Sequence, residues 1–263
     1  GAIGGLARLN VLRRCVPKSA VLHGRSDIAT VAAILSGVDA PVLWDVRSLW
    51  SDQRLLIGTP GWNRFTAYAA RGLENLAARK SSAMTTLTAA VVPILQQRHK
   101  RIPSITEVIP TCVQTSKFLA SPMPRARVTC LLSGTFNNYY DINRMKQVLD
   151  EIRKGMDLFV IWARAGESPT EHLGVGEDLI ITASHSEMPR LVQESHFGVA
   201  ICKQDNLDSL AAAVPTKIGE FLASGRPVIV SSGIGDLDQM LSSTKTGLII
   251  DHRDSLKEVG QQS

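Results

Sequence analysis

The sequence predicts an α/β fold built on parallel β-sheets. Short apolar runs recur along the chain, and each is followed by a turn and then by a stretch with helical periodicity. The apolar runs are continuous rather than alternating, as expected for strands that are buried on both faces. Regular alternation of strand and helix favours parallel sheets that are covered by helices.

The predicted strands are rich in β-branched and large apolar residues, which suit a buried, pleated surface. They comprise residues 20–22, 42–46, 106–110, 128–132, 158–163, 179–182, 197–202, 227–231 and 247–250. The predicted helices follow Ser26 and occupy residues 62–80, 142–153, 187–194 and 216–223. The second half of the chain gives strand and helix in regular order, whereas the first half supplies fewer strands than a doubly wound sheet needs.

A turn-rich segment at residues 110–124 holds three prolines and lacks both helical and strand periodicity. We interpret it as the link between two Rossmann-like domains, one of residues 1–118 and one of residues 119–263. The N-terminal domain is expected to be incomplete, and the chain to be truncated at both ends.

The composition is ordinary for a soluble protein, with 44% hydrophobic and 20% charged residues among 263. No apolar run approaches the roughly 18 residues that span a bilayer, and residues 1–15 lack the apolar core of a signal peptide. We therefore expect a cytoplasmic protein. The net charge of +5 comes without a nucleic-acid motif, which favours phosphorylated ligands or a membrane surface as partners and argues against nucleic acid.

The cysteines and histidines give no metal-binding pattern. The four cysteines form no CxxC pair and are expected to be reduced, mostly buried thiols: Cys15, Cys112, Cys130 and Cys202. Three histidines lack partners at metal-ligand spacing and are interpreted as surface or loop residues: His99, His172 and His185. His196 adjoins a strand and is expected to pack against it. No metal and no prosthetic cofactor are predicted.

The segment at residues 215–232, PTKIGEFLASGRPVIVSS, carries the strongest chemical signal. Pro215 suits a first helical turn, because its missing N–H would have no partner there. The free N–H groups of Thr216 and Lys217 would then face an anion, which the helix macrodipole and the lysine charge both favour. Glu220 lies one turn further on the same side, where its carboxylate can accept hydrogen bonds from a ribose diol.

Gly225 is expected to end this helix, and the segment then predicts a phosphate-binding helix start at the carboxyl end of a parallel strand. On the residues alone, a generic strand–helix–strand unit with a surface Lys217 and Glu220 is the alternative.

The stretch PTKIGEFLASGRPVI resembles the donor-site signature of glycosyltransferase family 4. Further stretches resemble that family in its order and approximate spacing: VLHGRS at 21–26, LWDVRSLWSD at 43–52, VIPTCVQTSKF at 108–118, LLSGTFNNYYD at 131–141, HSEMPRLVQESHFGVA at 185–200 and GIGD at 233–236. The resemblance implies a GT-B-like fold, in which two Rossmann-like domains face a cleft.

The resemblance also implies a reaction. A sugar would move from a nucleoside diphosphate sugar, the co-substrate, to an acceptor hydroxyl, with retention and without a metal, in bacterial surface polysaccharide or glycolipid synthesis. Implied partners are the nucleotide sugar, a glycan or lipid-linked glycan acceptor and, at the inner face of the membrane, anionic lipid in peripheral contact.

The resemblance assigns residues to three groups. The catalytic candidates are His23, Arg25, Lys217 and Glu220. The donor-binding candidates are Gly134, Thr135, Arg164, Pro215, Thr216, Lys217 and Glu220. On the acceptor side are Asp45 and Arg47, which either line an acceptor pocket or form a buried ion pair; we favour the pair.

Two departures from the family pattern bear on function. Ala212 stands where many members carry a glutamate that contacts the donor sugar. Residues 137–140 (NNYY) stand where a basic pair often neutralises the diphosphate, and Arg164 is a possible substitute.

Two further features leave alternatives open. His23 and Arg25 are expected after the strand at 20–22, either contacting sugar or as exposed polar residues of a turn. Helix 62–80 combines aromatic and basic residues, which suits either core packing with a solvated basic face, the interpretation we favour, or an interfacial helix on anionic lipid.

Two other functions compete with glycosyl transfer. One is a truncated or degenerate copy that binds nucleotide without turnover. The other is a GT-B sugar-nucleotide 2-epimerase, which would need a carboxylate-rich cleft that the sequence does not display.

Overall fold

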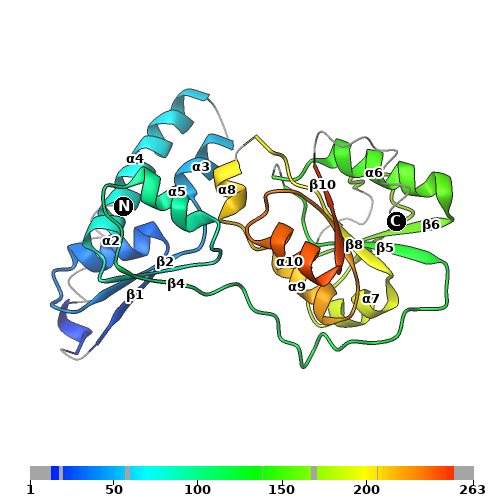
Figure 1. The fold of residues 1–263 in the computed structure, drawn as a ribbon, viewed down its shortest axis with the longest axis horizontal. Coiled ribbons are helices and arrows are strands. Elements are labelled where there is room, and N and C mark those ends of the chain that lie inside the picture. The colour runs from blue at the N-terminus through cyan, green and yellow to red at the C-terminus, as the bar shows by residue number, and fades with distance from the viewer. Residues whose placement is uncertain are drawn as a thin grey trace. The chain divides into compact units, whose positions relative to one another are not determined.

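A computed structural model describes residues 13–17, 20–56, 60–137, 139–166, 171–205 and 207–251, except for the side chains of residues 56 and 60–63. The chain forms two compact units (Figure 1). Unit 1 comprises Gly1–Pro110 and Asn206–Ala213, and unit 2 comprises Thr111–Asp205 and Val214–Ser263. The sequence analysis places the division at 118/119, whereas the units meet at Pro110/Thr111 and a short later stretch belongs to unit 1.

Unit 1 contains a four-stranded parallel sheet in the order β1-β2-β3-β4. Its strands are β1 (Leu22–Arg25), β2 (Val42–Val46), β3 (Ala83–Thr86) and β4 (Ile105–Val108). Its helices are α2 (Asp27–Leu35), α3 (Trp50–Leu56), α4 (Pro60–Lys80), α5 (Val91–Arg98) and α8 (Leu207–Ala211). The core of this unit gathers around Trp44, which is completely buried on β2.

Charged side chains are buried beside this core. Nε2 of His99 lies 2.9 Å from Oε1 of Glu74, and both side chains are almost fully buried. Nη1 of Arg98 lies 2.6 Å from Oδ2 of Asp52, and the same guanidinium also pairs with Asp208 on α8. His99 does lie in a loop, directly after Arg98, but it is not a surface residue, because its ring pairs with a buried carboxylate from α4.

The ion pair between Arg98 and Asp208 helps to explain why α8 belongs to unit 1. Besides the Arg98–Asp208 pair, the hydroxyl of Thr88 donates a hydrogen bond of 2.6 Å to the carbonyl of Ala211. Ala212 is buried in the apolar core cluster of the same unit. Side chains from helices and loops far away in sequence thus hold this short helix.

Unit 2 contains a six-stranded parallel sheet in the order β10-β9-β8-β5-β6-β7. Its strands are β5 (Val128–Ser133), β6 (Leu158–Arg164), β7 (Leu179–Thr182), β8 (Phe197–Ala200), β9 (Val228–Ser231) and β10 (Gly247–Ile250). Its helices are α6 (Ile142–Gly155), α7 (Met188–Glu194), α9 (Thr216–Ala223) and α10 (Leu237–Thr244). The strand order reverses direction between β5 and β8, as in doubly wound folds.

Helices cover both faces of this sheet. The connection from β5 to β6 and the connection from β8 to β9 run in opposite directions along the sheet. Because such connections are right-handed, their helices lie on opposite faces of the sheet. Figure 1 accordingly shows α6 on one side of the strands and α7 and α9 on the other. The predicted α/β architecture with two parallel sheets is confirmed.

A buried arginine fastens the segment that leads into unit 2. Arg226 is 1% exposed, and its guanidinium donates hydrogen bonds to the carbonyls of Ser121 at 2.8 Å, Pro122 at 3.0 Å and Gln193 at 2.6 Å. Burial lowers the pKa of this guanidinium. The turn-rich segment therefore owes its path to side-chain hydrogen bonds rather than to secondary structure.

Several local predictions need correction. The first strand is Leu22–Arg25, so His23 and Arg25 lie within it rather than after it. Strand β3, with the weakly apolar sequence AMTT, and helices α3, α5, α8 and α10 are not among the predicted elements. Cys130 and Cys202 are buried as predicted, but two of the four thiols, Cys15 and Cys112, are exposed. The interpretation of residues 1–15 falls largely outside the described residues.

Candidate functional site

A cavity of about 330 Å³ opens at the carboxyl edge of the unit 2 sheet. Its walls come from the ends of β5 and β6, the turn after β7 and the first turns of α9. In open α/β sheets, ligands bind at this edge, where the strand order reverses. The cavity brings together all of the predicted donor-binding residues: Gly134, Thr135, Arg164, Pro215, Thr216, Lys217 and Glu220.

The glycine loop after β5 presents backbone to the cavity. Gly134 has φ 85°, a left-handed conformation that residues with a Cβ adopt at a cost. Its N–H donates to the carbonyl of Ala163 at 2.8 Å, and its carbonyl accepts a hydrogen bond of 2.9 Å from Nε1 of Trp162. The space that a side chain would occupy at Gly134 is open, so a ligand can approach this backbone closely.

Helix α9 starts at the cavity. Pro215 has φ −65° and ψ 115° and stands immediately before the first helical residue, Thr216, rather than within the first turn as predicted. N–H groups of a first helical turn lack intrahelical acceptors, and the macrodipole makes this end favourable for an anion by about 0.3–1 kcal/mol. Gly225 follows the helix with φ 72°, as predicted for the residue that ends it.

Lys217 points its ammonium between the glycine loop and two aromatic rings. Nζ donates a hydrogen bond of 3.2 Å to the carbonyl of Ser133. The same atom lies 4.0 Å from the ring centre of Phe136 and 4.3 Å from that of Tyr140. Burial lowers the pKa of Lys217 to about 8.

Glu220 lies one helical turn further along the same wall and is half-buried. Burial raises the pKa of its carboxyl group, while His185 and Lys217 act in the opposite direction. His185, interpreted as a surface or loop residue, is indeed exposed in a turn, but it also lines the cavity. In the sequence, only the position of His185 in the segment that leads into α7 indicated that it lies near the cavity.

Arg164 contributes less free charge to the cavity than the sequence suggested. The side chain is buried at the end of β6, and Nη1 lies 3.1 Å from Oε2 of Glu171. Its guanidinium also stacks over the ring of Trp162 at 5.0 Å. Lys217 is therefore the better candidate for the cation that meets an anionic ligand.

The acceptor-side candidates lie together at the end of the unit 1 sheet. Oδ2 of Asp45 lies 3.4 Å from Nε2 of His23 and 3.9 Å from Nη1 of Arg47, and Oδ1 accepts a hydrogen bond of 3.3 Å from Thr85. The favoured ion pair between Asp45 and Arg47 is present, although Arg47 is only half-buried. Arg25 is exposed and pairs in register with Asp45.

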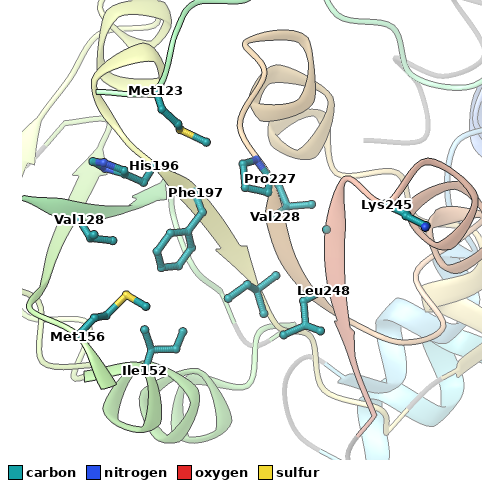
Figure 2. A pocket seen from close by; sticks show the side chains of 12 residues that line it. Met123, Val128, Ile152, Met156, His196, Phe197, Pro227, Val228, Lys245 and Leu248 are labelled. Atoms are coloured by element: carbon teal, nitrogen blue, oxygen red, sulfur yellow. The ribbon is translucent and has the colours of Figure 1, made fainter. Parts of the chain in front are cut away.

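A second cavity, of about 500 Å³, lies at the opposite, amino-terminal edge of the unit 2 sheet (Figure 2). Ile152 of α6 and Met156, which directly follows this helix, face Phe197 and Leu248 of the strands across it. The ring of His196 packs at its rim, and Nδ1 accepts a hydrogen bond of 3.0 Å from the N–H of Thr129, which agrees with a packing role. This apolar cavity lacks the helix start and the paired Lys and Glu of the first one.

Among the described residues, no group of three or more His, Cys, Asp or Glu side chains is arranged to hold a metal ion. Within the same residues, none of the helices is long and apolar enough to cross a bilayer.

Comparisons with known proteins show similarity of fold. No protein-family model and no curated protein sequence matches the chain. Solved structures do match. TarM superposes with a TM-score of 0.68 at 12% identity over 97% of this chain and 49% of TarM. WaaG, a glycosyltransferase involved in lipopolysaccharide biosynthesis, gives a TM-score of 0.66 at 13% identity, and the match covers 96% of this chain and 69% of WaaG. HepE from Anabaena, in complex with UDP and glucose, gives a TM-score of 0.68 at 13% identity, and the match covers 100% of this chain and 72% of HepE.

These similarities establish the fold, which is that of GT-B glycosyltransferases. The chain spans about half the length of TarM and about 70% of WaaG and HepE.

Proposed function

We propose that the chain is the larger part of a glycosyltransferase that moves a sugar from a nucleoside diphosphate sugar to an acceptor hydroxyl. The observation that carries this proposal is the cavity of unit 2. There, the start of α9, the Lys217 ammonium, the open backbone at Gly134 and the Glu220 carboxylate converge on one space. The likeness to glycosyltransferase structures supports the same class of reaction.

Each group has a role in this proposal. The diphosphate lies against the N–H groups of α9 and the backbone of Gly134, with Lys217 as the cationic partner. Glu220 accepts hydrogen bonds from the ribose hydroxyls. When the bond to the sugar breaks, negative charge accumulates on the departing diphosphate, and prepositioned dipoles and a cation stabilise it.

We further propose that the transfer retains the anomeric configuration and needs no metal. The resemblance of residues 215–235 to family 4 supports both features, and Lys217 with the helix dipole supplies positive charge at the diphosphate. On the acceptor side, the group of His23, Arg25, Asp45 and Arg47 offers donors and a carboxylate to sugar hydroxyls. Product anomers identified by NMR and assays in EDTA test these two features.

A surface of unit 1 supports peripheral contact with the inner face of a bacterial membrane, where a lipid-linked acceptor would reside. We call it the α4 surface; it consists of Phe65, Tyr68, Arg79 and Lys80 on α4 and of Lys100 and Arg101 after α5. Phe65 is 68% and Tyr68 85% exposed, so these rings do not pack in the core as favoured from the sequence. None of the four basic residues pairs with a described carboxylate, and such a surface suits anionic lipid.

One observation favours a second candidate, a protein that binds nucleotide without turnover. Ala212, which replaces the expected sugar-contacting glutamate, is 2% exposed within the core cluster of unit 1. Recognition of the donor sugar would then rest on other residues.

The proposal is tested by titrating UDP, GDP and ADP into the protein and by assaying hydrolysis of the matching sugar nucleotides. We expect Lys217→Ala and Glu220→Ala each to weaken nucleotide binding about tenfold or more. Matched controls are Lys154→Ala and Glu194→Ala, which remove the same charges from exposed ion pairs on α6 and α7. Unchanged nucleotide affinity in both site variants would place the site elsewhere, and binding without hydrolysis or transfer would favour the second candidate.

A further inference from the structure

Two aromatic side chains occupy the loop where the sequence resemblance leads one to expect basic residues. Phe136 and Tyr140 follow β5, with ring centres 4.6 Å apart and ring planes at 70°. Both rings face Nζ of Lys217, at 4.0 and 4.3 Å. At this distance the negative face of an aromatic ring attracts a cation.

Backbone contacts join Tyr139 and Tyr140 to the segment that follows β8. Tyr140 forms an antiparallel bridge with Cys202, and the N–H of Lys203 donates to the carbonyl of Tyr139 at 3.0 Å. Phe136 and Tyr140 also pack against the apolar core of unit 2. The rings therefore contact both the apolar core of unit 2 and the ammonium of Lys217.

An aromatic wall differs from a carboxylate in one respect that matters for function. Ring faces stabilise a cation without neutralising it, whereas a carboxylate would cancel its charge. Lys217 forms no ion pair with any carboxylate that the structure describes, and its hydrogen bond goes to the neutral carbonyl of Ser133. Its positive charge thus remains available to an anion in the cavity.

We propose that Phe136 and Tyr140 form an aromatic cage that positions the uncompensated ammonium of Lys217 for the donor diphosphate, and that diphosphate binding is coupled to protonation of this lysine. The inference rests on the proposed function, because it assumes that the cavity binds a nucleoside diphosphate. Phe136 and Tyr140 act here as positioning residues.

The environment of Lys217 decides whether diphosphate binding takes up or releases a proton. Burial lowers the pKa of Lys217 to about 8, so part of the free protein holds a neutral amine above this pH. A bound diphosphate favours the charged form, which raises the pKa of Lys217 in the complex and draws a proton from solution. Affinity for UDP should therefore be constant below pH 7.5 or so and fall as the pH rises through about 8.

Two other titratable groups that face Lys217 ionise well above this range. Burial raises the pKa of Cys202 to about 11, and it also raises the pKa of Tyr140 above its usual value. Burial raises the pKa of the Glu220 carboxyl group as well, and the exposed His185 is the further titratable side chain that lines the cavity. The last ionisation of a phosphate, near pH 6, is also complete.

Calorimetric titration of UDP at pH 8, in two buffers with different heats of ionisation, measures the protons taken up on binding. We expect an uptake of about half a proton for the unmodified chain. In Lys217→Arg the guanidinium stays charged, and the uptake should vanish. A purely structural role of Lys217 would leave the protein without such an uptake.

The rings are tested by substitution. Phe136→Leu and Tyr140→Leu should weaken UDP binding about 5-fold or more, whereas Tyr140→Phe, which keeps the ring, should recover most of the affinity. The matched control is Phe159→Leu, because Phe159 on β6 stacks with Arg127 and not with Lys217. Circular dichroism checks the fold of each variant.

The outcomes separate the two proposals. If the unmodified chain binds none of UDP, GDP and ADP, the proposed function fails and the cage with it. If UDP binds without proton uptake, or binds equally well to folded leucine variants, the cage is refuted while the proposed function stands. Should the leucine variants not fold, the proton uptake of the unmodified chain and of Lys217→Arg still decides.

Discussion

Nε1 of Trp44 donates a hydrogen bond of 2.9 Å to Oδ1 of Asp27 in the interior of unit 1. The contact joins the start of α2 to β2. Burial and the nearby Glu74 raise the pKa of Asp27 to about 7, against the favourable effects of Trp44 and His99. A buried carboxyl group of this kind makes the stability of unit 1 depend on pH.

The direction of this dependence can be predicted. The pKa of Asp27 is higher in the folded than in the unfolded chain, so its contribution to stability is fully present below about pH 4 and is lost as the pH rises to about 7. Asp27→Asn cannot ionise and keeps an oxygen for Trp44. We expect it to raise the free energy of unfolding by about 2 kcal/mol more at pH 8 than at pH 5. Urea unfolding at both pH values measures this, and an equal effect at both would contradict the prediction.

The Glu74–His99 pair should be energetically coupled. Both side chains are almost fully buried at 2.9 Å, so removing one partner leaves the other without its main compensation. Glu74→Leu and His99→Leu are each expected to lower the free energy of unfolding by about 3 kcal/mol, and the double variant by clearly less than the sum. Denaturant unfolding of the four proteins gives the coupling energy. Additive losses would show that the pair contributes no mutual stabilisation.

Gly134→Ala should harm binding more than folding. Its φ of 85° costs a residue with a Cβ about 1 kcal/mol, although the added methyl group meets no protein atom. The methyl group would instead point into the space proposed for the diphosphate. We expect a small loss of stability and UDP affinity weakened about tenfold or more. Gly155→Ala, at the end of α6 with open space around it, is the matched control and should bind UDP normally.

The α4 surface should bind anionic lipid electrostatically. Each basic residue near an anionic membrane contributes about 1 kcal/mol, so the double charge reversal Lys100→Glu and Arg101→Glu should weaken binding at least about tenfold. Vesicle sedimentation compares phosphatidylcholine alone with mixtures containing phosphatidylglycerol. The double reversal Lys146→Glu and Lys154→Glu, on α6 of unit 2, controls for net charge. Binding that is insensitive to salt, or equal on both types of vesicle, would count against this surface.

Local sequence patterns predicted much of unit 2. The continuous apolar runs that became β5, β8 and β9 are recognisable because most of their residues, on both faces of the sheet, are buried within one short stretch. The start of α9 and its end at Gly225 follow from the backbone preferences of proline and glycine. Weakly apolar strand β3 was missed, because four residues with two threonines carry too little periodicity to stand out.

The sequence by itself determined the class of fold and the helix start that faces the candidate donor, because both depend on residues adjacent along the chain. Only the tertiary structure decided which groups surround them. Phe136 and Tyr140 contact Lys217, which lies some 80 residues further along the chain. His99 contacts Glu74 in a buried core, and the residues next to either side chain in the sequence do not indicate this contact. Such contacts depend on how sheets and helices pack, and the free energy of burying one group is set by neighbours far away in sequence.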